Sequence, residues 1–142
     1  MKKFAFLLSL ILLCLSCQNQ SQSQKPASDS ETTTQSAPVL VNEVVSVERF
    51  KALMTETSDF QLIDVRTPEE YSEGHIEASL NLNFRDANFD AQLEQLDKTK
   101  PVLVYCRSGN RSGQTAAKMK ALQFQQVFDL EGGFEAWAME EK

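Results

Sequence analysis

The spacing of apolar positions along residues 39–142 predicts two kinds of element, β-strands and α-helices. Continuous apolar runs at 60–65 and 101–106 predict buried strands, and the second is apolar enough for the centre of a sheet. The pattern also predicts strands at 42–47, 79–84 and 126–130, and helices at 47–54, 67–74, 89–96, 112–122 and 132–140. Strands that alternate with helices predict an α/β fold, with a mainly parallel central sheet and helices on both faces.

The helix predicted at 67–74 carries clear start and stop signals. Thr67 stands at the N-cap position, Pro68 opens the helix, and Glu70 completes a capping box with Thr67. Gly74 follows the last turn, where helices commonly end on glycine. The sequence therefore predicts a short, well-delimited helix directly after the strand at 60–65.

The first residues predict a secretory signal. Two lysines precede an apolar stretch at 4–15 that is too short to span a bilayer, and a small residue precedes Cys17. This arrangement resembles the lipobox of bacterial lipoproteins, which implies removal of residues 1–16 and lipidation of Cys17; the usual leucine three residues earlier is Cys14 here. The alternative is ordinary cleavage near the same point, which would leave a secreted, unanchored protein. We expect export in both cases, and in the first a lipid anchor in the bacterial cell envelope, on a periplasmic or outer-surface face.

Residues 17–38 predict a flexible tether. They are rich in Gln, Ser and Thr and contain almost nothing to bury, so they cannot offset the entropy of ordering a chain. A flexible segment of this length reaches about 25 Å. We expect residues 39–142 to form one domain. Loss of the two leader lysines would lower the formal charge from −6 to −8, and an acidic chain without a basic cluster argues against nucleic acid as a partner.

Cys106 is the candidate reactive residue. If the leader cysteine is removed and Cys17 carries lipid, Cys106 is the one thiol left in the mature chain. It follows an apolar strand and precedes a helix, where unpaired N–H groups and the helix dipole stabilise a thiolate. Arg107 and Arg111 add positive charge, and Gly109 permits a tight turn that brings N–H groups inward. These residues predict a nucleophilic sulfur in an anion-binding loop at the carboxyl end of the sheet.

The motif CRSGNRS, residues 106–112, resembles the active-site loop of the rhodanese sulfurtransferases. LIDVRTPEEYSEGHI and FDLEGGFEAW resemble two further motifs of that family, in the family's order, so the resemblance spans residues 44–137. It implies a compact, single-domain rhodanese-like fold in which Cys106 takes a sulfane sulfur from thiosulfate or a related donor as a persulfide and passes it to a thiol or cyanide. The loop backbone would hold the terminal sulfur, and the arginines would attract an anionic donor. The substrate-binding residues implied are Arg107, Ser108, Gly109, Asn110, Arg111 and Ser112.

Three places depart from the family pattern. Glu77 and Ala78 stand where the family commonly has Pro and Gly, and Asn83 stands where it commonly has Pro. Gln123 replaces the usual glycine before Phe124, and a left-handed backbone at Gln123 would cost about 1 kcal/mol. These changes affect local turn geometry and leave the chemistry of the cysteine loop intact.

Two other functions compete with sulfur transfer. Rhodanese-related phosphatases and arsenate reductases use a loop one residue longer between cysteine and arginine, whereas four residues separate Cys106 from Arg111. The resemblance therefore favours sulfur chemistry over phosphate chemistry. A non-enzymatic rhodanese-like module, which binds a partner or carries sulfur, is the alternative, because one fold can serve both uses.

Several further residues are expected to be structural. Asp64 and Arg66 are expected to form a charge pair that supports the pocket, and Phe134 and Trp137 to pack the last helix onto the core. His75 is the one histidine, so the sequence predicts neither a metal cluster nor a catalytic Cys–His pair, and no cofactor is expected. The expected partners are a small sulfur-containing anion, a thiol acceptor and a membrane reached through lipid, with the protein itself a monomer.

Overall fold

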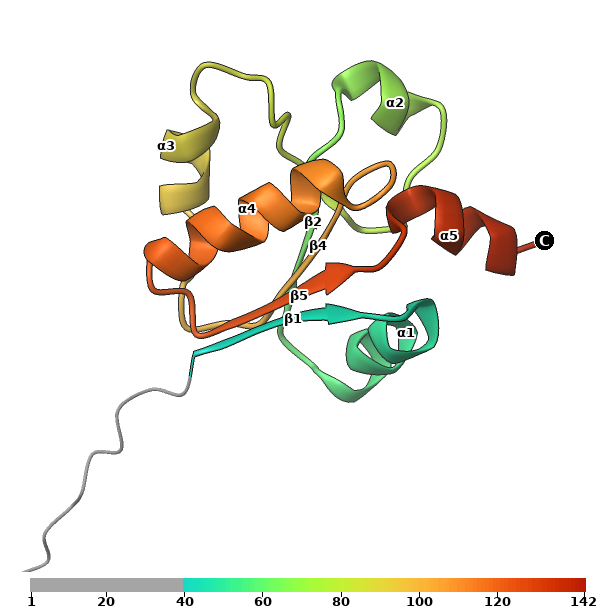
Figure 1. The fold of residues 1–142 in the computed structure, drawn as a ribbon, viewed down its shortest axis with the longest axis horizontal. Helices are drawn as coiled ribbons and strands as arrows, with labels where there is room; N and C mark the ends of the chain where they lie inside the picture. Colours follow the sequence, from blue (N-terminus) through green and yellow to red (C-terminus); the bar gives the residue numbers. More distant parts are fainter. Residues whose placement is uncertain (1–39) are drawn as a thin grey trace, which may run out of the picture. The chain divides into compact units, whose positions relative to one another are not determined.

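Five parallel strands form the centre of the domain. The computed structural model describes residues 40–142, so the predicted signal, Cys17 and the tether lie outside the described residues. The strands are β1 (Val41–Val45), β2 (Gln61–Asp64), β3 (Leu80–Asn81), β4 (Val102–Tyr105) and β5 (Gln126–Leu130). The helices are α1 (Val47–Glu56), α2 (Pro68–Ser72), α3 (Phe89–Glu94), α4 (Asn110–Ala121) and α5 (Gly133–Glu140). The sheet order is β1-β5-β4-β2-β3 with every neighbouring pair parallel, which confirms the predicted fold class (Figure 1).

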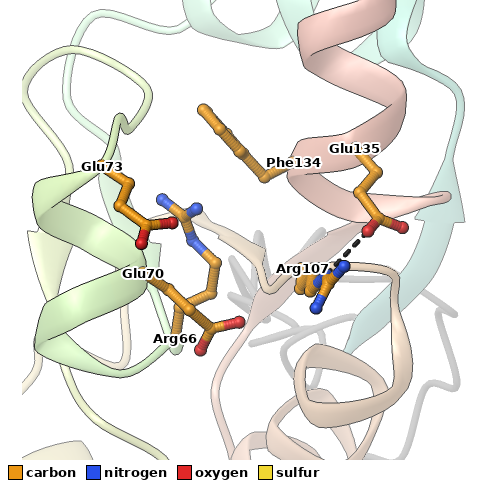
Figure 2. Close-up of a pocket in the computed structure, with 6 residues that line it drawn as sticks. All are labelled: Arg66, Glu70, Glu73, Arg107, Phe134 and Glu135. Carbon is orange, nitrogen blue, oxygen red and sulfur yellow. Dashed lines mark hydrogen bonds and ion pairs between the residues drawn. The ribbon is translucent and has the colours of Figure 1, made fainter.

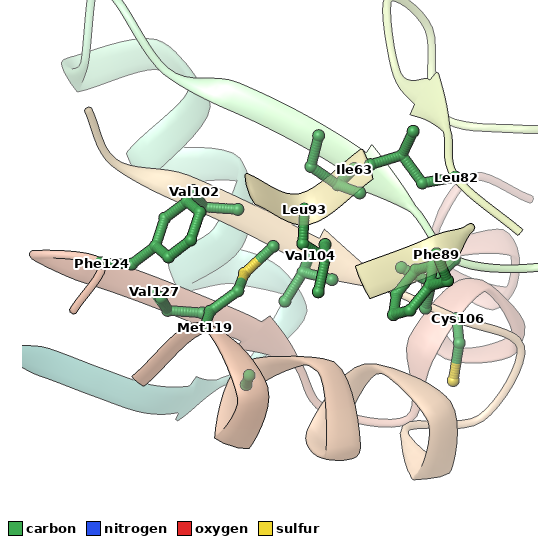
Figure 3. Packing of buried hydrophobic residues seen from close by; sticks show 12 residues of the cluster. Ile63, Leu82, Phe89, Leu93, Val102, Val104, Cys106, Met119, Phe124 and Val127 are labelled. Atoms are coloured by element: carbon green, nitrogen blue, oxygen red, sulfur yellow. The ribbon is translucent and has the colours of Figure 1, made fainter. Parts of the chain in front are cut away.

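Helices cover both faces of the sheet, as predicted. On one face α1 and α5 pack around the fully buried Phe50 and Leu130. On the other face α3 and α4 pack around Leu93 and Met119 (Figure 3). All four residues of β4 are buried, because this central strand has a strand on each side and helices above and below. No helix among residues 40–142 is long and apolar enough to cross a membrane.

Most elements differ from their predicted extents by one or two residues at an end, and two of the differences affect the description of the site. The strand expected at 79–84 is reduced to β3, a two-residue edge strand paired with the end of β2. The helix expected at 112–122 begins two residues earlier, at Asn110, because Gly109 adopts a left-handed conformation and serves as its N-cap. The earlier start of α4 brings its first turn directly against Cys106, as described below.

The capping box predicted for α2 is present. Thr67 Oγ1 accepts a hydrogen bond from the Glu70 N–H at 3.4 Å, and Glu70 Oε2 accepts one from the Thr67 N–H at 3.0 Å. These bonds satisfy N–H groups that the first turn of a helix leaves unpaired. α2 is only one turn long, so its placement depends on this cap and on what the Glu70 carboxylate contacts beyond the helix.

Non-glycine residues hold two left-handed positions. Gln123 has φ 66° and ends α4 in a Schellman motif, in which the Phe124 N–H donates to Met119 O at 3.1 Å. Ala78 has φ 63°, at the position where the related family commonly carries glycine. Gln123 thus takes the left-handed conformation, and the fold accommodates a strain of about 1 kcal/mol there.

Asp129 places a carboxyl group inside the layer between β5 and α4. Its residue is 4% exposed, and Oδ1 has no hydrogen-bond partner among the described residues. Its Oδ2 faces Gly113 of α4, where an added Cβ would lie at an ordinary contact distance of 3.5 Å. Burial raises the pKa of Asp129 to about 6, although the hydroxyl of Ser112 lowers it in part. The charged form of Asp129 therefore destabilises the folded protein.

Replacing Asp129 with asparagine is expected to stabilise the protein at pH 8 and to have little effect at pH 4. The folded-state pKa of about 6 lies above the ordinary value of 3.8, so the folded state holds the proton more tightly. Stability should then fall as pH rises from about 4 to about 6 and stay low above that range, a loss of up to about 3 kcal/mol. Urea unfolding of both proteins at the two pH values measures the difference. A gain of equal size at pH 4 and pH 8 would contradict this assignment.

Candidate active site

Cys106 begins the Cys106 loop, residues 106–111, which connects β4 to α4. The residue is 1% exposed, and its sulfur points away from the other side chains of the core cluster (Figure 3). Gly109, with φ 95°, turns the loop so that its N–H donates to Cys106 Sγ at 3.1 Å. The hydroxyl of Ser112 donates to the same sulfur at 3.5 Å. The tight turn predicted at Gly109 thus places hydrogen-bond donors around the sulfur.

These donors favour the thiolate form of Cys106. Burial raises the pKa of the thiol, whereas hydrogen bonds from the hydroxyl of Ser112 and from the backbone N–H groups of Ser112, Ser108 and Gly109 lower it. The donors outweigh burial, and the pKa of Cys106 lies below its ordinary value. A thiolate is the nucleophilic form of cysteine, so this environment is suited to attack on an electrophilic sulfur.

Two backbone hydrogen bonds connect the start of α5 to the Cys106 loop. The Phe134 N–H donates to Cys106 O at 2.8 Å, and the Glu135 N–H donates to Arg107 O at 3.0 Å. A Cβ on Gly133 would lie 2.5 Å from Cys106 O, so this close approach requires glycine. We refer to these two hydrogen bonds as the α5 clamp. The sequence shows the GG pair in FDLEGGFEAW as part of a motif, but no local signal indicates that Gly133 contacts the Cys106 loop.

The two arginines of the Cys106 loop are both paired with carboxylates. Arg111 forms two 2.7 Å hydrogen bonds with Glu70, and Arg107 Nε lies 2.7 Å from Glu135 Oε1. Hydrogen bonds from Arg111 are the main reason that the pKa of Glu70 is lowered to about 2. The attraction of an anionic donor by these arginines stays a prediction, and the structure shows that each positive charge is already compensated.

Glu70 therefore has a second role that its sequence context did not reveal. The sequence identified it only as the closing residue of a capping box. In the structure Oε2 accepts hydrogen bonds both from the Thr67 N–H and from Arg111 Nη1. One carboxylate thus fixes α2 and connects it to the Cys106 loop, across a sequence distance of 41 residues.

The ion pair expected between Asp64 and Arg66 is present and buried. Arg66 Nη2 lies 2.6 Å from Asp64 Oδ2, and it also donates to Gly74 O at 2.6 Å. The Arg66 guanidinium stacks over the Phe134 ring at 4.1 Å from the ring centroid. Phe134, expected only to pack the last helix, therefore also shapes the site, whereas Trp137 packs edge-on against Phe50 as a core residue should.

A pocket of about 320 Å³ opens beside the Cys106 loop, between α2 and α5 (Figure 2). We call it the α2/α5 pocket; its lining residues are Arg66, Glu70, Glu73, Arg107, Phe134 and Glu135. The side chain of Cys106 does not line it. The pocket adjoins the loop because Arg107 follows Cys106 directly and Glu70 binds Arg111. A small molecule bound in this pocket would lie next to the Cys106 loop.

The remaining candidate residues lie outside this pocket. Ser108 and Asn110 are exposed, and the side chain of Asn110 accepts a hydrogen bond from Gln114 at 2.9 Å along α4. His75 stacks on Tyr71 with ring centroids 3.9 Å apart, a structural position away from Cys106. Within residues 40–142, no group of three or more His, Cys, Asp or Glu side chains is placed to hold a metal ion.

Comparison with known proteins agrees with this geometry. A family profile described as a Rhodanese-like domain matches residues 46–140. A sulfurtransferase of Allochromatium vinosum is 35% identical over 99 residues, which cover 70% of this chain and 90% of that protein. The thiosulfate sulfurtransferase GlpE of Coxiella burnetii is 38% identical over 84 residues, which cover 59% of this chain and 77% of that protein.

Solved structures show the same fold. A rhodanese-related protein from Thermoplasma volcanium has a TM-score of 0.61 at 24% identity, with 69% of this chain and 92% of that chain covered. A rhodanese-like domain protein from Staphylococcus aureus has a TM-score of 0.60 at 24% identity, with 67% and 90% covered. From the family profile, its sulfurtransferase relatives and the fold together, the chain belongs to the rhodanese-like family.

Proposed function

We propose that this protein is a rhodanese-type sulfurtransferase in which Cys106 carries the transferred sulfur as a persulfide. Thiosulfate or a related sulfane compound would be the donor, and a thiol or cyanide the acceptor. The observation that carries this proposal is the ring of donors around Cys106 Sγ, which lowers the pKa of the thiol in a chain whose relatives include named sulfurtransferases.

In the first half of the cycle, the Cys106 thiolate attacks the outer sulfur of the donor. With thiosulfate, a bond forms between Sγ and that sulfur, and the bond to sulfite breaks. Sulfite leaves with the electron pair, and Cys106 becomes a persulfide anion. The backbone N–H groups of Ser108 and Gly109 interact with Sγ, and we expect them to hold the terminal sulfur of the persulfide as well.

In the second half, a nucleophile takes the terminal sulfur. An acceptor thiolate forms a new sulfur–sulfur bond, the bond to Sγ breaks, and the electron pair returns to Cys106 as a thiolate. Gly109 and Ser112 stabilise this leaving thiolate through the same hydrogen bonds that favoured it at the start. One set of donors therefore serves both halves of the cycle.

We further propose that the domain works outside the cytoplasm, anchored by lipid on Cys17. The support is the leader pattern ahead of Cys17 and the polar segment that follows it. Mass spectrometry of the N-terminal peptide of the mature protein should show a diacylated or triacylated Cys17. Cys17→Ser is expected to abolish the acyl mass; an unmodified Cys17 at the N-terminus of the mature wild type would contradict the anchor.

Treatment of the reduced protein with thiosulfate or polysulfide is expected to add the mass of one sulfur atom to Cys106. Cyanide should remove that sulfur as thiocyanate, because it attacks the terminal atom of a persulfide. Cys106→Ala should gain no sulfur and keep the circular dichroism spectrum of the wild type. If the folded, reduced wild type gains no sulfur from either donor, the sulfurtransferase proposal is wrong and the non-enzymatic binding module is favoured.

Gly133→Ala is expected to lower both the stability and the reactivity of Cys106. The added Cβ would collide with Cys106 O and a left-handed φ of 60° is strained for alanine, so we expect a loss of about 2 kcal/mol or more. The displaced loop should also raise the pKa of Cys106, which the pH dependence of thiol alkylation measures. Gly113→Ala is the matched control, since its Cβ meets only Asp129 at ordinary contact distance in a helix, where alanine is favoured by about 1 kcal/mol. Equal alkylation profiles for the two variants would rule out the α5 clamp as the support of the site.

A further inference from the structure

We infer that the α2/α5 pocket selects an acceptor thiol that carries a positive charge close to its sulfur, over neutral and anionic thiols of the same size. An alkylammonium thiol is the simplest member of this class. The inference rests on the proposed function, because it concerns the second half of the cycle, when the Cys106 persulfide is discharged.

The charges that surround the pocket leave an excess of carboxylate. Two guanidinium groups line it, and each already has a carboxylate partner: Arg66 with the buried Asp64, and Arg107 with Glu135. Glu70 also lines the pocket and is paired with Arg111. Glu73 also lines the pocket. The lining thus carries two positive and three negative charges, and an anionic acceptor would have to break an existing ion pair to find a free cation.

Glu73 is the carboxylate best placed to meet an incoming cation. Its side chain forms no hydrogen bond or ion pair with any other residue of the described range, and it is exposed at the end of α2. Figure 2 shows Glu70 and Glu73 on the α2 side of the pocket and Glu135 on the α5 side. An ammonium group that enters between these helices meets carboxylates from both of them.

A positive charge on the acceptor thiol favours transfer of the terminal sulfur from the Cys106 persulfide. The attacking thiolate and the persulfide are both anions, so they repel each other as they approach. After the acceptor sulfur bonds to the terminal sulfur, the bond to Sγ breaks and Cys106 keeps the electron pair; the ammonium group takes no part in bonding. An ammonium group on the acceptor offsets the negative charge of its thiolate, so the acceptor is repelled less by the persulfide. The ammonium is also attracted to Glu73, and both effects raise the rate at which the acceptor meets the protein.

Discharge of the preloaded protein by three thiols of matched length tests the inference. Cys106 is first charged with polysulfide and freed of excess reagent, and then cysteamine, 2-mercaptoethanol or 3-mercaptopropionate is added. Each rate is divided by the rate of the same thiol with uncharged 2,2′-dithiodipyridine, which removes differences in thiol pKa and intrinsic nucleophilicity. We expect normalised rates to fall in that order, with about a tenfold difference between the first and last, and the difference to shrink at high salt.

Variants at Glu73 test whether the preference for the cationic thiol arises in the α2/α5 pocket. Glu73→Gln is expected to reduce the preference by about threefold, and Glu73→Lys to reverse its direction. Glu94→Gln on α3 makes the same charge change away from the α2/α5 pocket and should leave the preference unchanged. Because the Glu73 side chain has no partner to lose within the described residues, these variants should fold as the wild type does.

The outcomes separate this inference from the proposed function. A protein that gains no sulfur overturns the proposed function and the inference with it. A protein that loads and discharges normally, but with equal normalised rates for the three thiols, overturns the inference alone. The same holds if the preference is unchanged in Glu73→Lys, or if the anionic thiol reacts fastest.

Discussion

The position of Cys106 depends on how closely the backbone of α5 approaches the backbone of the Cys106 loop. In the α5 clamp, N–H groups of α5 donate hydrogen bonds to the carbonyl groups of Cys106 and Arg107. The backbone of the loop is thereby oriented with its own N–H groups toward the sulfur. Gly133 makes this approach possible, because any side chain there would overlap Cys106 O. The reactivity of the thiol therefore originates partly in a helix 27 residues further along the chain.

Neutral dipoles contribute most to the stabilisation of the sulfur, and the guanidinium of Arg111 also interacts with it. The donors to Sγ are the Gly109 N–H and the Ser112 hydroxyl, whereas Arg107 and Arg111 are compensated by Glu135 and Glu70. Buried dipoles are screened little by salt, and they need no counter-ion when the sulfur is neutral. The arginine–carboxylate pairs instead connect α2, the Cys106 loop and α5. Glu73 then leaves the α2/α5 pocket with an excess of negative charge.

Local signals in the sequence were sufficient to predict much of this architecture. The apolar runs located β2 and β4, the Thr67–Glu70 pair located the start of α2, and the position of Gly109 indicated the turn around the sulfur. Each of these depends on residues that are close in the chain. β3 was overestimated, because an edge strand pairs only as far as its neighbour allows.

The parts of the site that were missed depend on contacts between distant residues. Glu70 was recognised as a cap but not as the partner of Arg111, and Glu135 was not connected with Arg107. Nothing in the local sequence distinguishes an ion-paired glutamate from a solvated one. The pairing becomes visible only when the parallel order of β2, β4 and β5 brings the segments after these strands to the same edge of the sheet.

The order of Cys106 and α5 along the chain determines when, during synthesis, the Cys106 loop acquires its supporting hydrogen bonds. Cys106 is synthesised before Gly133, Phe134 and Glu135, which lie 27 to 29 residues further along the chain. Until those residues emerge, the carbonyl groups of Cys106 and Arg107 lack their α5 partners and the loop is not held around the sulfur. A nascent chain, or one cut short before Gly133, would contain the complete CRSGNRS motif as an ordinary thiol in an unsupported loop. Synthesis of the first turn of α5 is thus the step that completes the support of the Cys106 loop.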